Sequence, residues 1–200
     1  YRFAHMWLAS ALTVSFLIAG VSAFRWLLGD RSRDVRATLK VGLVLGALVI
    51  PVQIFMGDLH GLNTKEYQPA KVAAMEGVWD TQNSAPLLLF ALPNEETRSN
   101  DYAIGIPGLA SFILTHHWDG EVQGLNDFVA EDGTPMHPPV GMVFWSFRTM
   151  VGTGVAMLLL SWTAVFFMWR RRTQHAFPEE RHWLAVDGLP KPLLFAMVPM

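Results

Sequence analysis

Arg148 is the most unusual charged residue of the sequence, because it stands among apolar residues shortly after the helix breaker Pro138-Pro139. In a helix that starts near Val140, it would lie roughly 12 Å from the helix start. An arginine at this depth in a membrane is costly and normally has an anionic partner or a water-filled cavity. The apolar segments contain no carboxylate that could pair with it. We therefore expect a partner from elsewhere in a longer chain, from a lipid or from a bound anionic cofactor; snorkelling to the outer surface is the alternative.

His5 and Met150 also lie in apolar segments. Histidine and methionine are an accepted axial pair for haem iron, so these two side chains are candidate metal ligands. Arg148 would then face a haem propionate, although residues 148 and 150 point about 200° apart around a helix. The alternative is that His5 is a packed, hydrogen-bonded residue and Met150 contributes only to packing.

A third group follows Pro69, where a proline in the first turn predicts a short helix. Glu76 and Asp80 are four residues apart and so predicted to share one helix face, with Lys71 partly offset. A lysine and a glutamate beside Trp79, close to a membrane surface, could bind a polar headgroup and accept its protons. The alternative is a solvated amphipathic helix. The other histidines of this region lack ligands at a known spacing and are predicted to be surface residues: His60, His116, His117 and His137.

The composition favours a membrane protein. The chain has 200 residues, of which 52% are hydrophobic and 16% charged, against about 25% charged residues on average. Mean hydropathy is positive, at +0.28. The sequence has no cysteine, which excludes disulfides, zinc-thiolate sites and iron–sulfur clusters within it. It begins at Tyr1 and ends in an apolar run, so we expect an internal piece of a longer chain.

The elements that must position these residues are membrane spans. Residues 3–24, 41–57 and 149–169 carry no formal charge, and a spanning helix needs about 20 residues. These runs predict helices over approximately 3–28, 39–57 and 140–169, with a truncated further helix starting in 191–200. The predicted fold is all-α, a polytopic transmembrane bundle of three full spans plus a partial fourth. Gly42 and Gly46 form a small-xxx-small pattern, which favours close helix packing.

Basic residues set the orientation of the spans. Five lie between the first two spans (Arg25, Arg31, Arg33, Arg36, Lys40) and five after the third (Arg170, Arg171, Arg172, Arg181, Lys191). We therefore expect the linker between the first two spans to be cytoplasmic, together with the segment 170–190. Residues 1–57 would then hold both spans and this linker. The segment 58–139 has three basic and twelve acidic residues, so it is predicted to be a long extracytoplasmic loop. Its apolar stretches 85–92 and 104–114 could lie on the membrane surface or dip into the protein.

Three motifs resemble one known family. The runs GDLHGLNT (57–64) and QPAKVAAMEGVWDTQ (68–82) closely resemble the quinol-binding loop of subunit I of cytochrome bd-type ubiquinol oxidases. FWSFRTMVG (144–152) is similar to that family's next helix, and RFAH (2–5) to the start of the helix two spans earlier. The compact loop resembles the short-loop, cyanide-insensitive branch. The resemblance covers roughly residues 1–170.

The resemblance implies a role for each matching residue. His5 and Met150 match the axial ligands of haem b558, Arg148 the arginine beside that haem, and Lys71 and Glu76 the loop residues of quinol oxidation. In the family, quinol gives electrons to haem b558 at the outer face of the bacterial inner membrane. The electrons pass to haem b595 and haem d, where oxygen is reduced to water, and a proton-motive force arises without pumping. The implied partners are ubiquinol or menaquinol, oxygen, membrane lipid, subunit II and a small single-helix subunit; no nucleic acid is expected.

The sequence departs from the family at both ends. The family's N-terminal haem-ligating histidine, the acidic helix before the position of His5 and a GRQPW segment after the last helix are absent from the 200 residues. The final twenty residues match only weakly. We therefore expect the quinol and haem b558 module alone, inactive as a fragment. Two alternatives remain: another membrane haem b cytochrome, or a transporter or channel with an outer loop. A plain membrane scaffold would explain the composition but not the loop motif.

Overall fold

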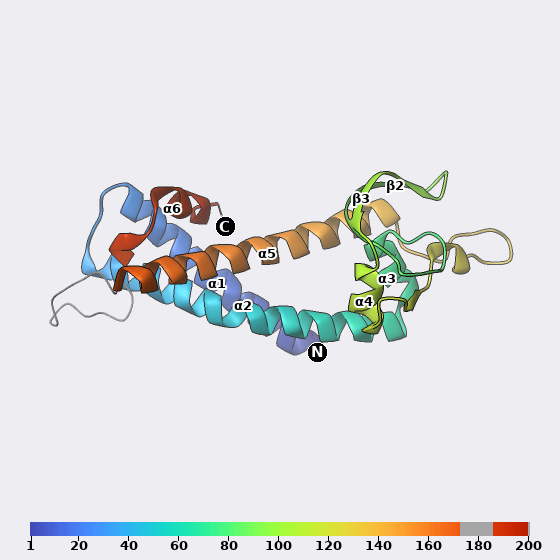
Figure 1. Cartoon of the computed structure of the whole chain (residues 1–200), viewed down its shortest axis with the longest axis horizontal. Coiled ribbons are helices and arrows are strands. Elements are labelled where there is room, and N and C mark those ends of the chain that lie inside the picture. The colour runs from blue at the N-terminus through green and yellow to red at the C-terminus, as the bar shows by residue number, and fades with distance from the viewer. Residues whose placement is uncertain (173–185, 200) are drawn as a thin grey trace. The chain divides into compact units, whose positions relative to one another are not determined.

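The computed structural model describes residues 1–172 and 186–199, and Figure 1 shows their course. The chain divides into two compact units. Residues 1–56 and 153–200 form one, called here the helical unit, and residues 57–152 form the other, called the loop unit. Of the predicted cytoplasmic segment 170–190, residues 173–185, including Arg181, lie outside the described part.

Three long helices confirm the prediction of a polytopic helical membrane protein. They are α1 (Arg2–Leu27), α2 (Arg33–Tyr67) and α5 (Val140–Arg172). Each is long and apolar enough to cross a membrane. Large apolar side chains such as Leu17, Phe55 and Leu159 are about three-fifths exposed, at 61%, 61% and 62%. Apolar surface of this extent fits a lipid or protein environment and not water.

The core of the helical unit brings four helices together. Its buried side chains come from α1, α2, α5, the single turn η3 (Val186–Gly188) and the short helix α6 (Lys191–Met197), and include Trp26, Leu39, Met168 and Leu194. Gly20 of α1 faces α6 so closely that a Cβ there would lie 2.8 Å from the Met197 carbonyl oxygen. The chain end is thus packed onto the first span.

The predicted close packing at Gly42 and Gly46 is confirmed. A Cβ at Gly42 would lie 2.7 Å from the Ser15 carbonyl oxygen, and one at Gly46 would lie 3.0 Å from the ring of Phe16. Small residues on α2 therefore let the backbone of α1 approach, as membrane helix pairs require. A hydrogen bond of 2.8 Å between the hydroxyls of Ser22 and Thr38 also joins these two helices.

Pro51 lies inside α2, where it cannot donate a backbone hydrogen bond to the carbonyl four residues earlier. That carbonyl belongs to Ala47, and the indole Nε1 of Trp162 on α5 donates to it over 3.1 Å. A side chain from a second helix thus replaces the bond that proline removes. This replacement matters inside a membrane, because no water is present there to bond the carbonyl.

In the loop unit, α2 continues past the predicted end of its span at residue 57 and stops at Tyr67. The first part of the predicted loop 58–139 is therefore helical. The physical reason is that residues 58–67 contain no proline, and the next helix breaker is Pro69, which disfavours a helical conformation for the residue before it. The predicted short helix after Pro69 is confirmed as α3 (Pro69–Glu76).

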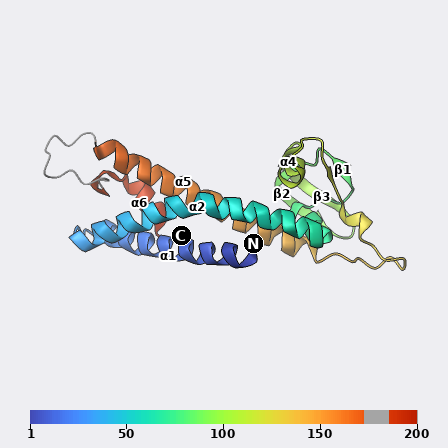
Figure 2. The same ribbon diagram turned by 90° about the horizontal axis from the view of Figure 1, so that it is seen from below.

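The apolar stretches of the loop are parts of a small folded structure (Figures 1 and 2). Strands β2 (Leu87–Asn94) and β3 (Ser99–Ile106) form an antiparallel hairpin in which Leu87 pairs with Ile106 and Asn94 with Ser99. Helix α4 (Leu109–Thr115) packs beside β2. Strands β1 (Gln82–Asn83) and β4 (Glu121–Val122) pair, and the turn η1 (Leu125–Asp127) follows.

Sequence reading missed these strands because residues 87–92 are almost continuously apolar and show no alternation. The turn of the hairpin is set by Asn94, whose side-chain oxygen accepts hydrogen bonds from the backbone N–H groups of Glu96 and Thr97. Ala85, Leu88 and Ala91 are buried within the loop unit.

Candidate functional site

The loop unit contains a buried ion pair between Glu76 and Arg148. Glu76 ends α3, and its Oε2 lies 2.6 Å from Nη2 of Arg148 on α5. Both side chains are nearly inaccessible, at 8% and 9% exposure respectively. The guanidinium also lies 4.8 Å from the ring centroid of Phe144 and 5.4 Å from that of Phe147.

This pair corrects the expectation that the partner of Arg148 must come from elsewhere in a longer chain, from a lipid or from a bound anionic cofactor. The spans hold no suitable carboxylate, but the loop supplies one. Sequence reasoning missed the pair because the two residues are 72 positions apart. The Nε of Arg148 is buried and has no hydrogen-bond partner within the described residues.

The residues around Glu76 do not form the single helix face predicted for them. Gly77 takes a left-handed conformation (φ 69°) and ends α3, so Asp80 is not on the helix. Asp80 is exposed and accepts a hydrogen bond from the Asn126 side chain over 2.7 Å. Lys71 is also exposed. Of the predicted acid–base group, Glu76 is buried while Lys71 and Asp80 face outward.

Asn100 on β3 is a residue of this site that the sequence did not indicate. Its amide nitrogen donates to the Gly77 carbonyl over 2.7 Å, and its amide oxygen accepts from Nε1 of Trp79 over 3.1 Å. One side chain thereby holds both the end of α3 and the buried indole after it. A cavity of about 350 Å³ opens here, lined by Trp79, Asp80, Arg98 and Asn100 among others.

His5 belongs to the helical unit, on α1. It is half-buried, and its Nε2 lies 3.2 Å from the side-chain nitrogen of Gln53 on α2. The amide nitrogen can only donate, so the imidazole nitrogen is the acceptor. A metal ion would bind through this same lone pair, so a haem ligated by His5 requires the Gln53 side chain to move away.

Met150 belongs to the loop unit, on α5, and is 53% exposed. It does not share the buried environment of Arg148, in agreement with the predicted angle between them. Its accessible thioether fits a haem ligand. Within residues 1–172 and 186–199, no group of three or more His, Asp or Glu side chains could hold a metal ion, and the loop histidines form no such cluster.

The fold and the site define an integral membrane protein with apolar spanning helices and a loop unit built around one buried ion pair. The model of the family "Cytochrome bd terminal oxidase subunit I" matches residues 1–198. The chain belongs to this family.

Two individual proteins are also similar to this chain. Cytochrome bd ubiquinol oxidase subunit 1 of Bacillus subtilis (strain 168) is 29% identical over 195 residues, which cover 94% of this chain and 42% of the relative. Cytochrome bd-II ubiquinol oxidase subunit 1 of Escherichia coli (strain K12) is 35% identical over 132 residues, 65% of this chain and 26% of the relative.

A solved structure, the bd oxidase from Geobacillus thermodenitrificans, is similar with a TM-score of 0.72 and 29% identity. The match covers 98% of this chain and 43% of that chain. The sequence thus spans about two-fifths of the length of these relatives or less.

Proposed function

We propose that this chain is the quinol-oxidising, haem b558-binding part of a terminal respiratory quinol oxidase of the bacterial inner membrane. The loop 58–139 would face the periplasm, and subunit II and a small single-helix subunit would complete the enzyme. The family match supports the general activity, and the buried Glu76–Arg148 pair is the observation that carries the assignment of the site.

Glu76 would serve as the proton acceptor when quinol is oxidised at the outer face. Oxidation of a quinol releases protons, and a carboxylate held in a fixed position beside the bound headgroup can take one. Arg148 positions this carboxylate through the ion pair, and Asn100 fixes the end of the helix that carries it. Lys71, exposed on the first turn of α3, would contact the polar quinol headgroup.

His5 and Met150 would hold haem b558 by supplying side-chain donors to its iron. The buried Nε of Arg148, which has no hydrogen-bond partner among the described residues, supplies a donor for an anionic group such as a haem propionate. When bound, this haem would carry electrons from quinol toward haem b595 and haem d, where oxygen is reduced to water and a proton-motive force results without pumping. The quinol is ubiquinol or menaquinol.

The ligand assignment is tested by visible spectroscopy of the complete oxidase. The low-spin haem b band of the reduced-minus-oxidised spectrum should disappear in His5→Ala and in Met150→Leu. His117→Ala and Met142→Leu are matched controls, because His117 and Met142 are exposed; both should keep the band. A band that survives in His5→Ala refutes the assignment, and a preparation without haem in a pyridine haemochrome assay would favour a transporter or channel.

The role of Glu76 is tested by turnover. Glu76→Gln should abolish quinol oxidation while every haem band remains, and Glu121→Gln, at an exposed position of β4, should leave turnover unchanged. Lys71→Gln should raise the KM for quinol more than it lowers kcat, because Lys71 is assigned to binding. Normal turnover in Glu76→Gln contradicts the proposal.

A further inference from the structure

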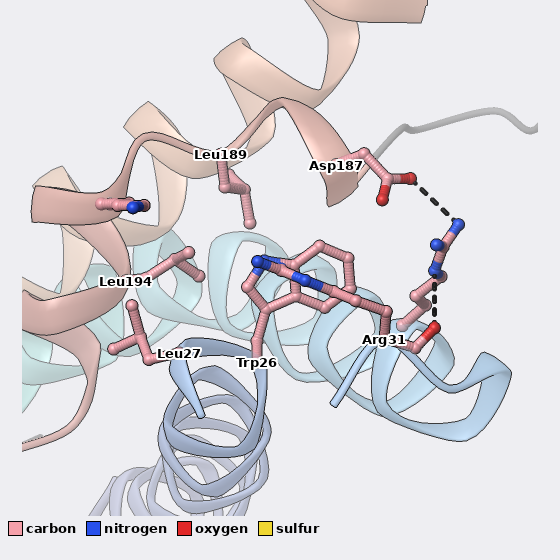
Figure 3. Close-up of a pocket in the computed structure, with 8 residues that line it drawn as sticks. Trp26, Leu27, Arg31, Asp187, Leu189 and Leu194 are labelled. Carbon is pink, nitrogen blue, oxygen red and sulfur yellow. Dashed lines mark hydrogen bonds and ion pairs between the residues drawn. The ribbon is translucent and has the colours of Figure 1, made fainter. Parts of the chain in front are cut away.

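The helical unit contains a second pocket, remote in sequence from the residues assigned to haem and quinol. It has a volume of about 410 Å³ and lies where α1 ends, α2 begins and the segment before α6 returns. Figure 3 shows Trp26, Arg31 and Asp187 around it. Three cationic side chains line the pocket, Arg31, Arg36 and Lys191, against one carboxylate, Asp187.

Two carboxylates near these cations already have basic partners. Asp187 accepts from Nη1 of Arg36 over 3.2 Å. Asp30 lies 2.6 Å from Nη2 of Arg25, and hydrogen bonds from Ser32, together with this arginine, lower the pKa of Asp30. Within residues 1–172 and 186–199, no ion pair neutralises Arg31 or Lys191. The described lining of the pocket therefore carries uncompensated positive charge.

Arg31 is held in a defined place by its neighbours. Its guanidinium carbon lies 3.9 Å from the ring centroid of Trp26, which is 5% exposed. Nε of Arg36 donates to the Arg31 carbonyl over 3.2 Å, which ties the backbone of this turn (Figure 3). A stacked guanidinium keeps its N–H donors free at the edge of its plane, in the fork geometry that suits a phosphate.

The opposite wall of the pocket is apolar. Leu27, Leu189 and Leu194 line it, and Leu189 and Leu194 belong to the buried core of the helical unit. The pocket therefore lies where two candidate spans end, with its cations next to an apolar surface. Basic pockets between membrane helices on the cytoplasmic side are suited to anionic headgroups.

We propose that this pocket binds the phosphate of an anionic phospholipid of the cytoplasmic leaflet. Arg31 and Lys191 contact the phosphate, Trp26 fixes Arg31, and the leucine wall takes the first part of the acyl chains. The proposal does not depend on the haem or quinol assignments, because none of its residues takes part in them.

The test measures binding of phosphatidylglycerol to the intact, delipidated oxidase by native mass spectrometry. Arg31→Gln and Lys191→Gln should each raise the Kd about fivefold, equal to about 1 kcal/mol. Arg33→Gln is the matched control, because Arg33 is exposed on the same turn but does not line the pocket; its Kd should stay at the wild-type value. All three proteins should elute at the same volume in size exclusion.

Two further ligands distinguish the source of the phosphate. Phosphatidylcholine has the same phosphate, but its quaternary ammonium cancels the net charge, so it should bind wild type more weakly than phosphatidylglycerol does. Inorganic phosphate at 100-fold molar excess over the lipid should not displace phosphatidylglycerol, because it lacks the acyl chains that the leucine wall takes. Equal phosphatidylglycerol affinity in wild type and Arg31→Gln overturns the proposal, as does an equal loss in Arg33→Gln. Displacement by inorganic phosphate would assign the pocket to a soluble anion instead.

Discussion

Pro51 on α2 and Trp162 on α5 affect the same backbone carbonyl, that of Ala47. The contribution of the hydrogen bond from Trp162 to the stability of the protein can therefore be isolated. The indole Nε1 of Trp162 donates to the Ala47 carbonyl, which Pro51 leaves without its helical donor. Interhelical hydrogen bonds in membranes contribute from about 0.6 to 2 kcal/mol. We therefore expect Trp162→Phe to lose about 1 kcal/mol from this bond, in addition to the loss of indole packing.

The Pro51→Ala background separates these two effects. An alanine at position 51 has an N–H that can bond to the Ala47 carbonyl. In this background Trp162→Phe should therefore lower the free energy of unfolding only through the loss of indole packing. The two costs should differ by about 1 kcal/mol, or about 3 °C in apparent Tm for a domain of this size. Tm can be read by fluorescence-detected size exclusion after heating of the full-length protein in detergent.

Trp169→Phe provides the control for this cycle, because Trp169 is also an exposed tryptophan of α5 and is not bonded to Ala47. Its shift in Tm should be the same with proline or alanine at position 51. If Trp162→Phe likewise gives equal shifts in both backgrounds, the replacement of the missing helix bond by Trp162 contributes nothing, and the reasoning is refuted.

Three further results are expected. Arg148→Gln leaves Glu76 buried without its partner and should lower the free energy of unfolding by about 3 kcal/mol. Hydrogen exchange would report this loss as about 150-fold faster exchange in residues 69–76. In the double variant with Glu76→Gln, the loss should be smaller than the sum of the two single losses, and an additive loss would refute the coupling. Gly42→Ala should lower Tm, since its Cβ would lie 2.7 Å from the Ser15 carbonyl oxygen, whereas Gly61→Ala on the same helix has open space and should not. Asn100→Ala should cost about 1–3 kcal/mol by leaving the Trp79 indole N–H and the Gly77 carbonyl unpaired, and it should speed exchange around residues 77–83. Asn126→Ala, which removes a side-chain bond to exposed Asp80, should not.

The sequence allowed the spans to be predicted because charge is absent from them, a signal carried by each residue separately. The close approach at Gly42 was also predictable, since small residues four positions apart share a helix face. The need of Arg148 for an anionic partner followed from its depth. The identity of this partner could not be predicted, because Glu76 meets Arg148 only in the folded loop. The role of Asn100 was hidden for the same reason, since it depends on the register of a hairpin whose apolar strands resemble a buried helix segment.

The Glu76–Arg148 pair also has a consequence for biosynthesis. Glu76 precedes Arg148 by 72 residues, so at a synthesis rate of 5–20 residues per second the carboxylate leaves the ribosome roughly 4–14 s before its cation. During this interval α3 has no counter-charge for the side chain that it must bury. The loop unit can reach its final packing only when α5 has been synthesised, so a nascent chain stalled before residue 148 should present α3 to proteases and chaperones.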